Sequence, residues 1–273
     1  METDNRQQQR GHTDGTGTPR DVVFLFDVDN TLLDNDAVLG DYRAHLVRES
    51  GREAADHYWA IFEELQRELG YVDYLGALQR YRLEHLHDTR VFLLSSYLLD
   101  YPFEERLYPG ALDVLARFGR LGLTVILSDG DVVFQPRKIE RSGISRAVED
   151  RVLIRIHKER ELECVERLYP AAHYVLVDDK LPILAAVKRI WGSRVTTVFP
   201  RQGHYALDPD VLSGSPPPDL AVTRISDLLD CDLPALLGAA PGVTAPRRRD
   251  ASTRPNDSQQ EPWTGGRVTG VAP

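Results

Sequence analysis

The chain has 273 residues, of which 42% are hydrophobic and 27% are charged, and its formal net charge is −9. This length and composition are typical of a soluble globular protein with one sizeable domain, or with a core domain and a smaller insert. The acidic balance argues against nucleic acid as the main partner, because binding a polyanion requires a basic face. An anionic substrate would need a cation in its binding site.

Three features of the chain narrow its class further. The two cysteines, Cys164 and Cys231, have neither metal-ligand spacing nor a disulfide framework, so we interpret them as reduced thiols of a cytoplasmic protein. No apolar run reaches the length of about 18 residues that a membrane-spanning helix needs. The polar residues 1–20 and the segment 238–273, rich in Pro, Gly, Ser and Arg, are expected to be a disordered leader and tail.

Short apolar runs alternate with helical patterns in the remaining chain. The first run, 22–26, is rich in β-forming residues and ends at an aspartate, which is typical of a buried parallel strand. Further strands are predicted at 124–127, 152–156, 174–177 and 195–198. Helices are predicted at 110–121, 136–142, 158–169 and 181–191. This alternation predicts an α/β fold, a Rossmann-like parallel sheet with helices on both faces.

One segment breaks the alternation. Residues 36–101 carry apolar residues at helical spacing and contain no convincing strand. The segment is too long for a loop, so we expect a small all-helical cap inserted after the first strand. The segments 21–35 and 102–237 would then form the core domain, with ligands bound beyond the carboxyl ends of its strands.

Two acidic residues follow the first predicted strand. Asp27 and Asp29 are two residues apart, so both side chains leave the strand on the same side. Burying two like charges together is unfavourable unless a cation or a proton intervenes. The alternative interpretation is a capped turn into a helix, with Asp29 or Thr31 as the N-cap.

Candidate ligands for phosphate and metal follow the other strands. Ser128 can donate its hydroxyl to a phosphate oxygen, although Ser-Asp-Gly is also good turn chemistry. Lys158 can place an ammonium group beside the carboxylates; Lys138 is a rival, and we prefer Lys158 because it opens the predicted helix that leads into the next strand. Asp178 and Asp179 can bind a hard divalent cation, or act as an N-cap and a partner of the helix dipole.

Together these motifs resemble those of the haloacid dehalogenase superfamily of hydrolases. Segments 26–32 and 127–131 are similar to its first and second motifs, Lys158 is similar to the third, and 178–179 is similar to the paired-acid form of the fourth. The insert directly after the first motif resembles the helical-cap branch of phosphatases, whose caps close over small substrates.

The resemblance implies a Mg²⁺-dependent phosphatase that acts on a small phosphorylated metabolite through an aspartyl-phosphate intermediate. It implies Asp27 as the nucleophile and Asp29 as the general acid and base. The acid at position 29 disfavours dehalogenation, because a halide leaves without protonation. The alternatives are a phosphomutase of the same superfamily and a catalytically idle ligand-binding relative.

The resemblance also implies which residues hold the ligands. Ser128 and Lys158 would hold the phosphoryl oxygens. Mg²⁺ would be held by the Asp27 carboxylate, the Asp29 backbone carbonyl and the pair 178–179, in which Asp179 aligns with the usual acid. The segment 201–205 is a less specific candidate for contact with the substrate or the cap, and the alternative is a solvated loop. Three residues of the expected cap, Tyr81, Arg82 and His85, are candidates for substrate specificity.

Overall fold

The structure is a computed structural model that describes residues 20–232. The expected tail lies outside this range, and so does the expected leader apart from Arg20, which is the first residue of the first strand. Within the range described, no helix is both long enough and apolar enough to cross a membrane.

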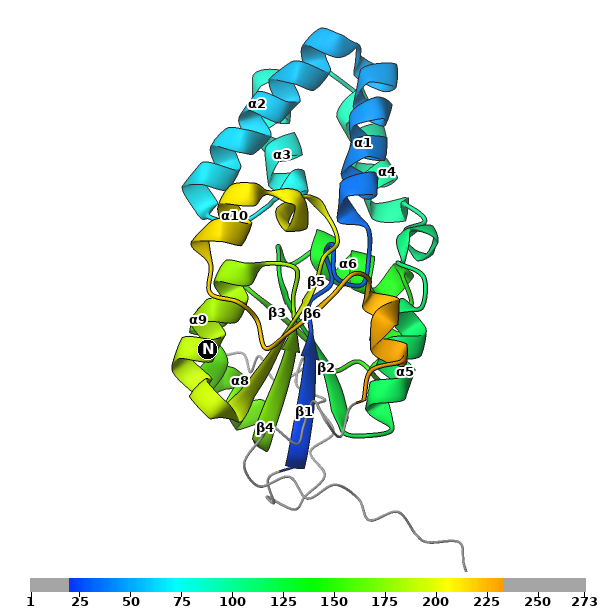
Figure 1. Ribbon diagram of the computed structural model, residues 1–273. Coiled ribbons are helices and arrows are strands. Elements are labelled where there is room, and N and C mark those ends of the chain that lie inside the picture. The colour runs from blue at the N-terminus through cyan, green and yellow to red at the C-terminus, as the bar shows by residue number, and fades with distance from the viewer. Residues whose placement is uncertain (1–19, 233–273) are drawn as a thin grey trace, which may run out of the picture. The chain divides into compact units, whose positions relative to one another are not determined.

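The core of the described chain is a parallel sheet of six strands in the order β3-β2-β1-β4-β5-β6 (Figure 1). The strands are β1 Arg20–Phe26, β2 Leu123–Asp129, β3 Val152–Arg155, β4 Ala171–Val177, β5 Val195–Pro200 and β6 Leu220–Val222. The predicted α/β fold is confirmed. Because the chain order reverses between β1 and β4, the ligand crevice of such a sheet is expected at the carboxyl ends of these two strands.

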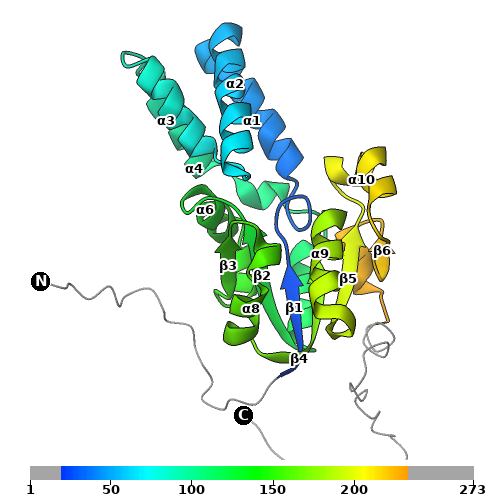
Figure 2. The ribbon, with the colours of Figure 1, turned by 90° about the vertical axis from the view of Figure 1, so that its left-hand side faces the viewer.

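Helices cover both faces of the sheet (Figures 1 and 2). Helices α8 (Leu162–Leu168) and α9 (Leu181–Trp191) lie on one face, and α5 (Ala111–Gly119) lies on the other. The other core helices are α6 Phe134–Arg141, α7 Ile144–Ala147 and α10 Pro209–Gly214. Short 3-10 turns are η1 Phe103–Arg106, η2 Lys158–Arg160, η3 Gly192–Arg194, η4 His204–Leu207 and η5 Ile225–Leu229.

Strand β1 is anchored by side chains that alternate between the two helix layers. Phe24 and Phe26 make edge contacts with Phe118 of α5, at ring-centroid distances of 4.8 and 5.5 Å. Val23 and Leu25 pack on the opposite face with residues of α8 and α9. Full burial of such a side chain contributes about 1.5–3 kcal/mol, so the position of the residue that follows β1 is well determined.

Four helices lie between β1 and α5, beyond the carboxyl ends of the strands (Figures 1 and 2), and we call them the helical insert. They are α1 Asn35–Ser50, α2 Arg52–Leu69, α3 Tyr74–Glu84 and α4 Arg90–Asp100. Tyr42 makes edge contacts with Tyr58 and Trp59 at 5.6 and 6.0 Å inside the insert. Tyr74 makes an edge contact at 5.1 Å with Phe134 of α6. The aromatic core of the insert therefore continues into the sheet domain.

The two linkers between the sheet domain and the insert run side by side. Leu33 and Leu107 form an antiparallel bridge. Asp34 accepts a hydrogen bond from a backbone N–H in the first turn of α1 at 2.9 Å. The N-cap of α1 is therefore Asp34, and the alternative interpretation of Asp29 or Thr31 as this cap is wrong. The expected domain boundaries themselves stay a prediction.

Several elements differ from those predicted from the sequence, and helices α7 and α10 were not predicted. Strand β6 was not predicted, because three residues at the sheet edge are too few to show a period. Helix α1 begins at Asn35, one residue before the expected insert. The predicted helix at Lys158 is a 3-10 turn, and α8 begins only at Leu162, because His157 has a φ of 60° and turns the chain there.

Candidate active site

Asp27 lies at the carboxyl end of β1, beside the point where the chain order reverses. Its backbone N–H donates to Val177 O of β4 at 2.9 Å, and the residue is 4% exposed. The chain then turns sharply: Thr31 N–H donates to Val28 O at 3.2 Å, and Asn30 has a φ of 57°. Asparagine tolerates this left-handed conformation better than most residues. The turn holds Asp27 in the crevice and directs the chain toward the insert.

Lys158 is the cation of this crevice. Its Nζ lies 2.5 Å from Asp27 Oδ1 and 2.6 Å from Asp178 Oδ2, and its side chain is 1% exposed. Burial alone lowers the pKa of this lysine, but the carboxylates of Asp178, Asp27 and Asp129 outweigh burial and raise its pKa. The Lys158 backbone N–H donates to Asp129 Oδ1 at 2.8 Å, which fixes the loop after β3. Of the two candidate lysines, the one beside Asp27 is Lys158, not Lys138.

Ser128 lies at the end of β2 between two partners. Its hydroxyl donates to Asp27 Oδ1 at 3.4 Å and accepts from Gln135 Nε2 at 3.0 Å. Two backbone N–H groups at the start of α6 donate to Asp131 Oδ1, at 2.8 and 2.7 Å. Asp131 therefore accepts the backbone hydrogen bonds that hold the turn after β2. The Ser128 hydroxyl is directed toward Asp27 instead of the turn.

Asp29 occupies a different environment from Asp27. Its side chain is 27% exposed, and its Oδ1 lies 2.7 Å from Lys138 Nζ. Gln135 Nε2 donates to Asp29 Oδ2 at 3.4 Å. The Lys138 ammonium is itself buried, and it also donates to Asn35 Oδ1 at 2.8 Å. The two aspartates are thus held by two different lysines.

The acid pair after β4 divides into two environments. Asp178 Oδ1 accepts a hydrogen bond from Lys180 N–H at 2.8 Å in a local turn, and its Oδ2 contacts Lys158. Asp179 N–H donates to Thr31 Oγ1 at 3.1 Å, yet both carboxylate oxygens of Asp179 are buried without a hydrogen-bond partner among the described residues. Both oxygens of Asp178 therefore have partners in the protein. The Asp179 carboxylate accepts no hydrogen bond from the described residues and is available to a cation.

The three buried acids form a donor set for a cation. Asp27, Asp178 and Asp179 each offer a carboxylate oxygen, and these atoms lie within 4.8 Å of one another. Burial, followed by the charges of Asp27 and Asp178, raises the pKa of Asp179 well above its usual value. Burial also raises the pKa of Asp178, although Lys158 opposes it. Because Mg²⁺ prefers oxygen ligands and buried carboxylates need a counter-charge, these residues fit such an ion.

The comparison with known families agrees with this arrangement. A family model for haloacid dehalogenase-like hydrolases matches residues 22–190, a range that contains every residue of the crevice described above. The chain belongs to the haloacid dehalogenase-like hydrolases. The family resemblance read from the motifs is thereby confirmed, and with it the assignment of the chain as a hydrolase.

Solved structures of haloacid dehalogenase-like hydrolases share this fold. A structure named as that of such a hydrolase from Burkholderia xenovorans LB400 is 63% identical, covers 80% of this chain and 99% of its own, and has a TM-score of 0.77. The HAD-hydrolase YfnB from Bacillus subtilis, bound to magnesium, is 18% identical, with coverages of 77% and 98% and a TM-score of 0.52. No sequence among the curated proteins matches this chain.

A haloacid dehalogenase has the same fold. The L-2-haloacid dehalogenase from Xanthobacter autotrophicus, with chloropropionic acid covalently bound, is 18% identical, covers 79% of this chain and 98% of its own, and has a TM-score of 0.51. Family membership and fold therefore leave the type of hydrolysis open.

Three residues around Asp29 were not predicted in these roles from the sequence of this hydrolase. Gln135 and Asn35 were not candidates, and Lys138 was a candidate only as a rival of Lys158. A signal for two of them was present: Gln135 and Lys138 are three residues apart on α6, a spacing that places two side chains on one helix face. For Asn35 the sequence contains no comparable signal.

The segment 201–205 makes hydrogen bonds to the turn that follows Asp27 and to the start of the insert. Gln202 Nε2 donates to Thr31 O at 3.1 Å, and its Oε1 accepts from Ile225 N–H at 2.5 Å. His204 Nδ1 lies 2.7 Å from Asp36 Oδ1 in the first turn of α1. This segment therefore holds the turn after Asp27 and the start of the insert.

The candidate specificity residues of the insert lie elsewhere. Tyr74, at the start of α3, contacts Phe134 of the sheet domain. Tyr81 is seven residues further along α3, about 10 Å along its axis at 1.5 Å per residue. Arg82 and His85 follow at the same end of the helix. The structure does not bring these three residues to the acid cluster.

Proposed function

We propose that this hydrolase is a Mg²⁺-dependent phosphatase that forms an aspartyl-phosphate on Asp27 and then hydrolyses it. The proposal rests on the different environments of the two acids, Asp27 and Asp29. Asp27 is buried against Lys158, whereas Asp29 is 27% exposed and held by Lys138. A nucleophile must attack as a carboxylate, while an acid–base residue must exchange protons with a leaving group and with water. The two environments support these two roles.

The reaction has two steps in this proposal. An Asp27 carboxylate oxygen attacks phosphorus, the bond from phosphorus to the ester oxygen breaks, and Asp29 donates its proton to that oxygen. Asp29, now a carboxylate, takes a proton from water, and the resulting hydroxide attacks phosphorus and breaks its bond to Asp27. Inorganic phosphate leaves. Lys158 and Ser128 hold the phosphoryl oxygens during both steps, and the lysine offsets their negative charge.

The buried acids supply the metal ligands in this proposal. Mg²⁺ would be held by the carboxylates of Asp27, Asp178 and Asp179 and by the backbone carbonyl of Asp29. When bound, the ion offsets the charge of these acids and of the phosphate. The unpartnered oxygens support Asp179 as the primary ligand of the acid pair. Asp178, which already contacts Lys158, would mainly orient that lysine.

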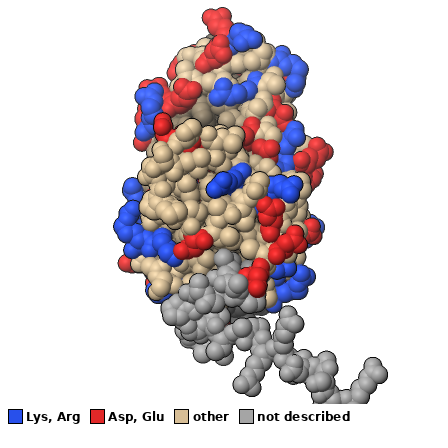
Figure 3. Space-filling model, in the orientation of Figure 1, with Lys and Arg blue, Asp and Glu red and all other residues tan. Residues whose placement is uncertain are grey.

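The proposed substrate is a small phosphorylated metabolite. The helical insert lies beyond the strand ends, where the helical caps of this superfamily close over small substrates (Figure 2). On the face shown in Figure 3, Lys and Arg side chains lie among Asp and Glu side chains and form no continuous basic area. These observations support neither nucleic acid nor a membrane as the partner, and we propose a cytoplasmic location.

Asp29 weighs against dehalogenation, the activity named for the fold relative from Xanthobacter autotrophicus. A halide leaves without a proton, so that reaction has no use for an acid two residues after the nucleophile. A phosphomutase, or a relative that binds without turnover, stays an alternative.

The proposal is tested by a substrate panel of sugar phosphates, nucleotides, phosphoglycolate, an aryl phosphate and a small 2-haloacid, each with and without Mg²⁺. We expect release of inorganic phosphate that requires Mg²⁺ and disappears in a folded Asp27→Asn variant. Release of halide, or full phosphate release by that variant, would overturn the proposal. An isomerised sugar phosphate in place of free phosphate would identify a mutase.

A further inference from the structure

The helical insert contains a second group of metal-type ligands, separate from the acid cluster. An open hollow of about 1250 Å³ lies between the start of α2, the end of α3 and the loop that leads into α4. Three of its lining side chains are His57, Glu84 and His85. The reaction proposed above uses none of them.

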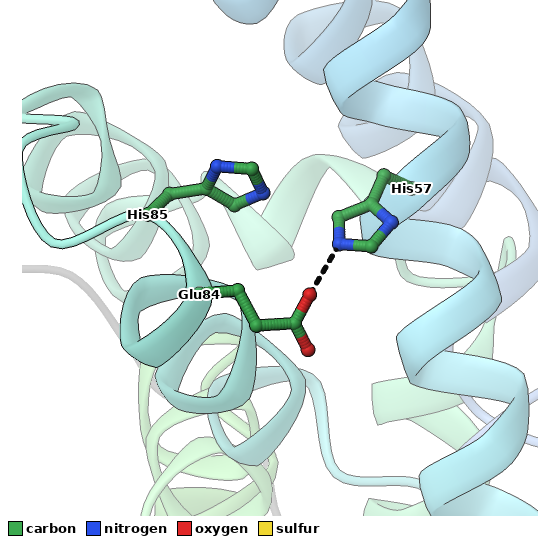
Figure 4. A group of neighbouring side chains, drawn as sticks. All are labelled: His57, Glu84 and His85. Atoms are coloured by element: carbon green, nitrogen blue, oxygen red, sulfur yellow. Dashed lines mark hydrogen bonds and ion pairs between the residues drawn. The ribbon is translucent and has the colours of Figure 1, made fainter.

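The three side chains converge from two helices (Figure 4). His57 extends from α2, and Glu84 and His85 extend from the end of α3. His57 Nε2 lies 2.7 Å from Glu84 Oε2. The two imidazole rings have centroids 5.3 Å apart and planes at 86°. One ligand atom from each residue lies within 4.8 Å of the other two.

The end of α3 explains how two adjacent residues face the same partner. Successive residues of a regular helix point about 100° apart. Glu84 is the last residue of α3, and His85 leaves the helical conformation with φ −128° and ψ 58°. The His85 N–H still donates to Tyr81 O at 3.1 Å, so the break is held in place. It turns the His85 imidazole toward the side of Glu84 and His57.

A buried tyrosine supports both imidazoles. The Tyr81 ring centroid lies 4.3 Å from that of His85 and 5.9 Å from that of His57. The Tyr81 hydroxyl donates to Asp88 Oδ2 at 3.2 Å, and Arg90 pairs with the same carboxylate at 2.6 Å. Contacts of this kind behind the ligands orient them before an ion binds.

We propose that His57, Glu84 and His85 bind a divalent first-row transition-metal ion, represented by Zn²⁺. Two imidazole nitrogens and one carboxylate oxygen suit Zn²⁺ and its neighbours, whereas Mg²⁺ and Ca²⁺ prefer sets made of oxygen alone. Tetrahedral bonds of about 2.0–2.2 Å place ligand atoms roughly 3.4 Å apart. The three side chains are exposed or partly exposed and line the hollow, so they are free to rotate toward that spacing.

The ion would strengthen a weak link within the insert. His57 and Glu84 have side chains that are 42% and 53% exposed, and an ion pair of this kind contributes little by itself. An ion bound by all three residues ties α2 to the end of α3. This binding is independent of the proposed phosphatase reaction, so the two proposals can fail separately.

Equilibrium dialysis against Zn²⁺, on the full chain without an affinity tag, tests the site. We compare the wild type with His57→Ala and with His87→Ala, a control that removes another exposed histidine of the same hollow. The acid cluster is unchanged in all three proteins, so any ion that it binds cancels in the comparison. We expect the wild type and His87→Ala to bind one more equivalent than His57→Ala. Mg²⁺-dependent phosphate release should be unchanged by His57→Ala.

A second variant, Glu84→Gln, and the visible spectrum of bound Co²⁺ test which side chains hold the ion. Glu84→Gln keeps the size of the side chain and should weaken Zn²⁺ binding by roughly tenfold or more, because a neutral amide is a poorer ligand. Co²⁺ in place of Zn²⁺ should give the intense visible absorption of a nitrogen-ligated ion, and His57→Ala should lose it. Equal binding by the wild type and His57→Ala would overturn the assignment, as would an equal loss in His87→Ala.

Discussion

The Lys138 ammonium lies 2.7 Å from Asp29 Oδ1 and 2.8 Å from Asn35 Oδ1. Asn35 is the first residue of α1, so one buried cation joins the proposed acid–base residue to the start of the helical insert. A movement of the insert that displaced Asn35 would alter the contacts of the lysine that holds Asp29.

Replacing Lys138 with Met removes the charge and keeps most of the buried chain. Among the described residues, the Asp29 carboxylate would then keep only the hydrogen bond from Gln135 at 3.4 Å and lose its orientation. We expect kcat for phosphate release to fall roughly 10- to 100-fold, the range that misplacement of a reacting group produces, with a smaller change in KM. Lys188→Met is the control, because Lys188 pairs with Asp219 on the surface. Wild-type turnover in Lys138→Met would contradict the positioning role.

Asp179→Asn tests the carboxylate that has no hydrogen-bond partner. The substitution removes a buried acid that accepts no hydrogen bond from the described residues and lies beside the acids Asp27 and Asp178, so the metal-free variant should be more stable than the wild type. We expect its melting temperature to rise by about 2–4 °C, the effect of roughly 1 kcal/mol in a protein of this size. Mg²⁺ should stabilise the wild type and not the variant. Asp219→Asn should lower the melting temperature of the metal-free protein, because Asp219 accepts hydrogen bonds from Lys188 and Thr197. A lower melting temperature for metal-free Asp179→Asn would count against this assignment.

Gly70 connects the insert to the loop that carries Lys158. It ends α2 with φ 76°, and a Cβ added there would lie 3.1 Å from the His157 ring. Gly143 has φ 81° and nothing within 4 Å of an added Cβ. Alanine at either position should cost about 1 kcal/mol of stability because of the left-handed backbone. Only Gly70→Ala should also change kcat or KM, and equal kinetics in the two variants would show that the contact has no role in the reaction.

His173 gives the protein a pH dependence of stability in the weakly acidic range. Burial, reinforced by the charge of Lys188, lowers the pKa of His173, and its Nε2 lies 2.9 Å from Thr196 Oγ1. The unfolded chain takes up a proton at the ordinary pKa of about 6.5, while the folded chain resists protonation. Stability is therefore present above that pH and is lost as the pH falls through it. Urea unfolding of His173→Gln should show a smaller loss between about pH 7.5 and about pH 5.5 than the wild type. The exposed His87→Gln variant should match the wild type, and an unchanged loss in His173→Gln would exclude His173 as the source.

The centre of the fold could be predicted because its strands are buried on both faces. Residues 22–26 are apolar without interruption, and in the structure their side chains alternate between two helix layers. That pattern also placed Asp27 and the pair 178–179 at one sheet edge, since residues that directly follow neighbouring parallel strands share an edge. Strand β6 lacked such a pattern because it has three residues at the sheet margin.

The partners of each acid could not be predicted in the same way. Lys138 and Lys158 both follow strand ends, and the choice between them depends on the course of the loops after β2 and β3. The helix that Lys158 was predicted to open is a 3-10 turn of three residues, and the lysine chosen is the one beside Asp27. The contact of Asp179 N–H with Thr31 Oγ1 joins residues 148 positions apart, and no local spacing encodes it.

Acid-quenched mass spectrometry of the Asp29→Ala variant shows whether Asp27 carries the phosphoryl group. With a nitrophenyl phosphate, whose leaving group needs no proton, this variant should form the phosphoenzyme and hydrolyse it slowly. We predict one phosphoryl group on the peptide that contains Asp27, and none when Asp27→Asn is added. Product formation with no phosphoryl group on Asp27, or with one on another residue, would exclude Asp27 as the nucleophile.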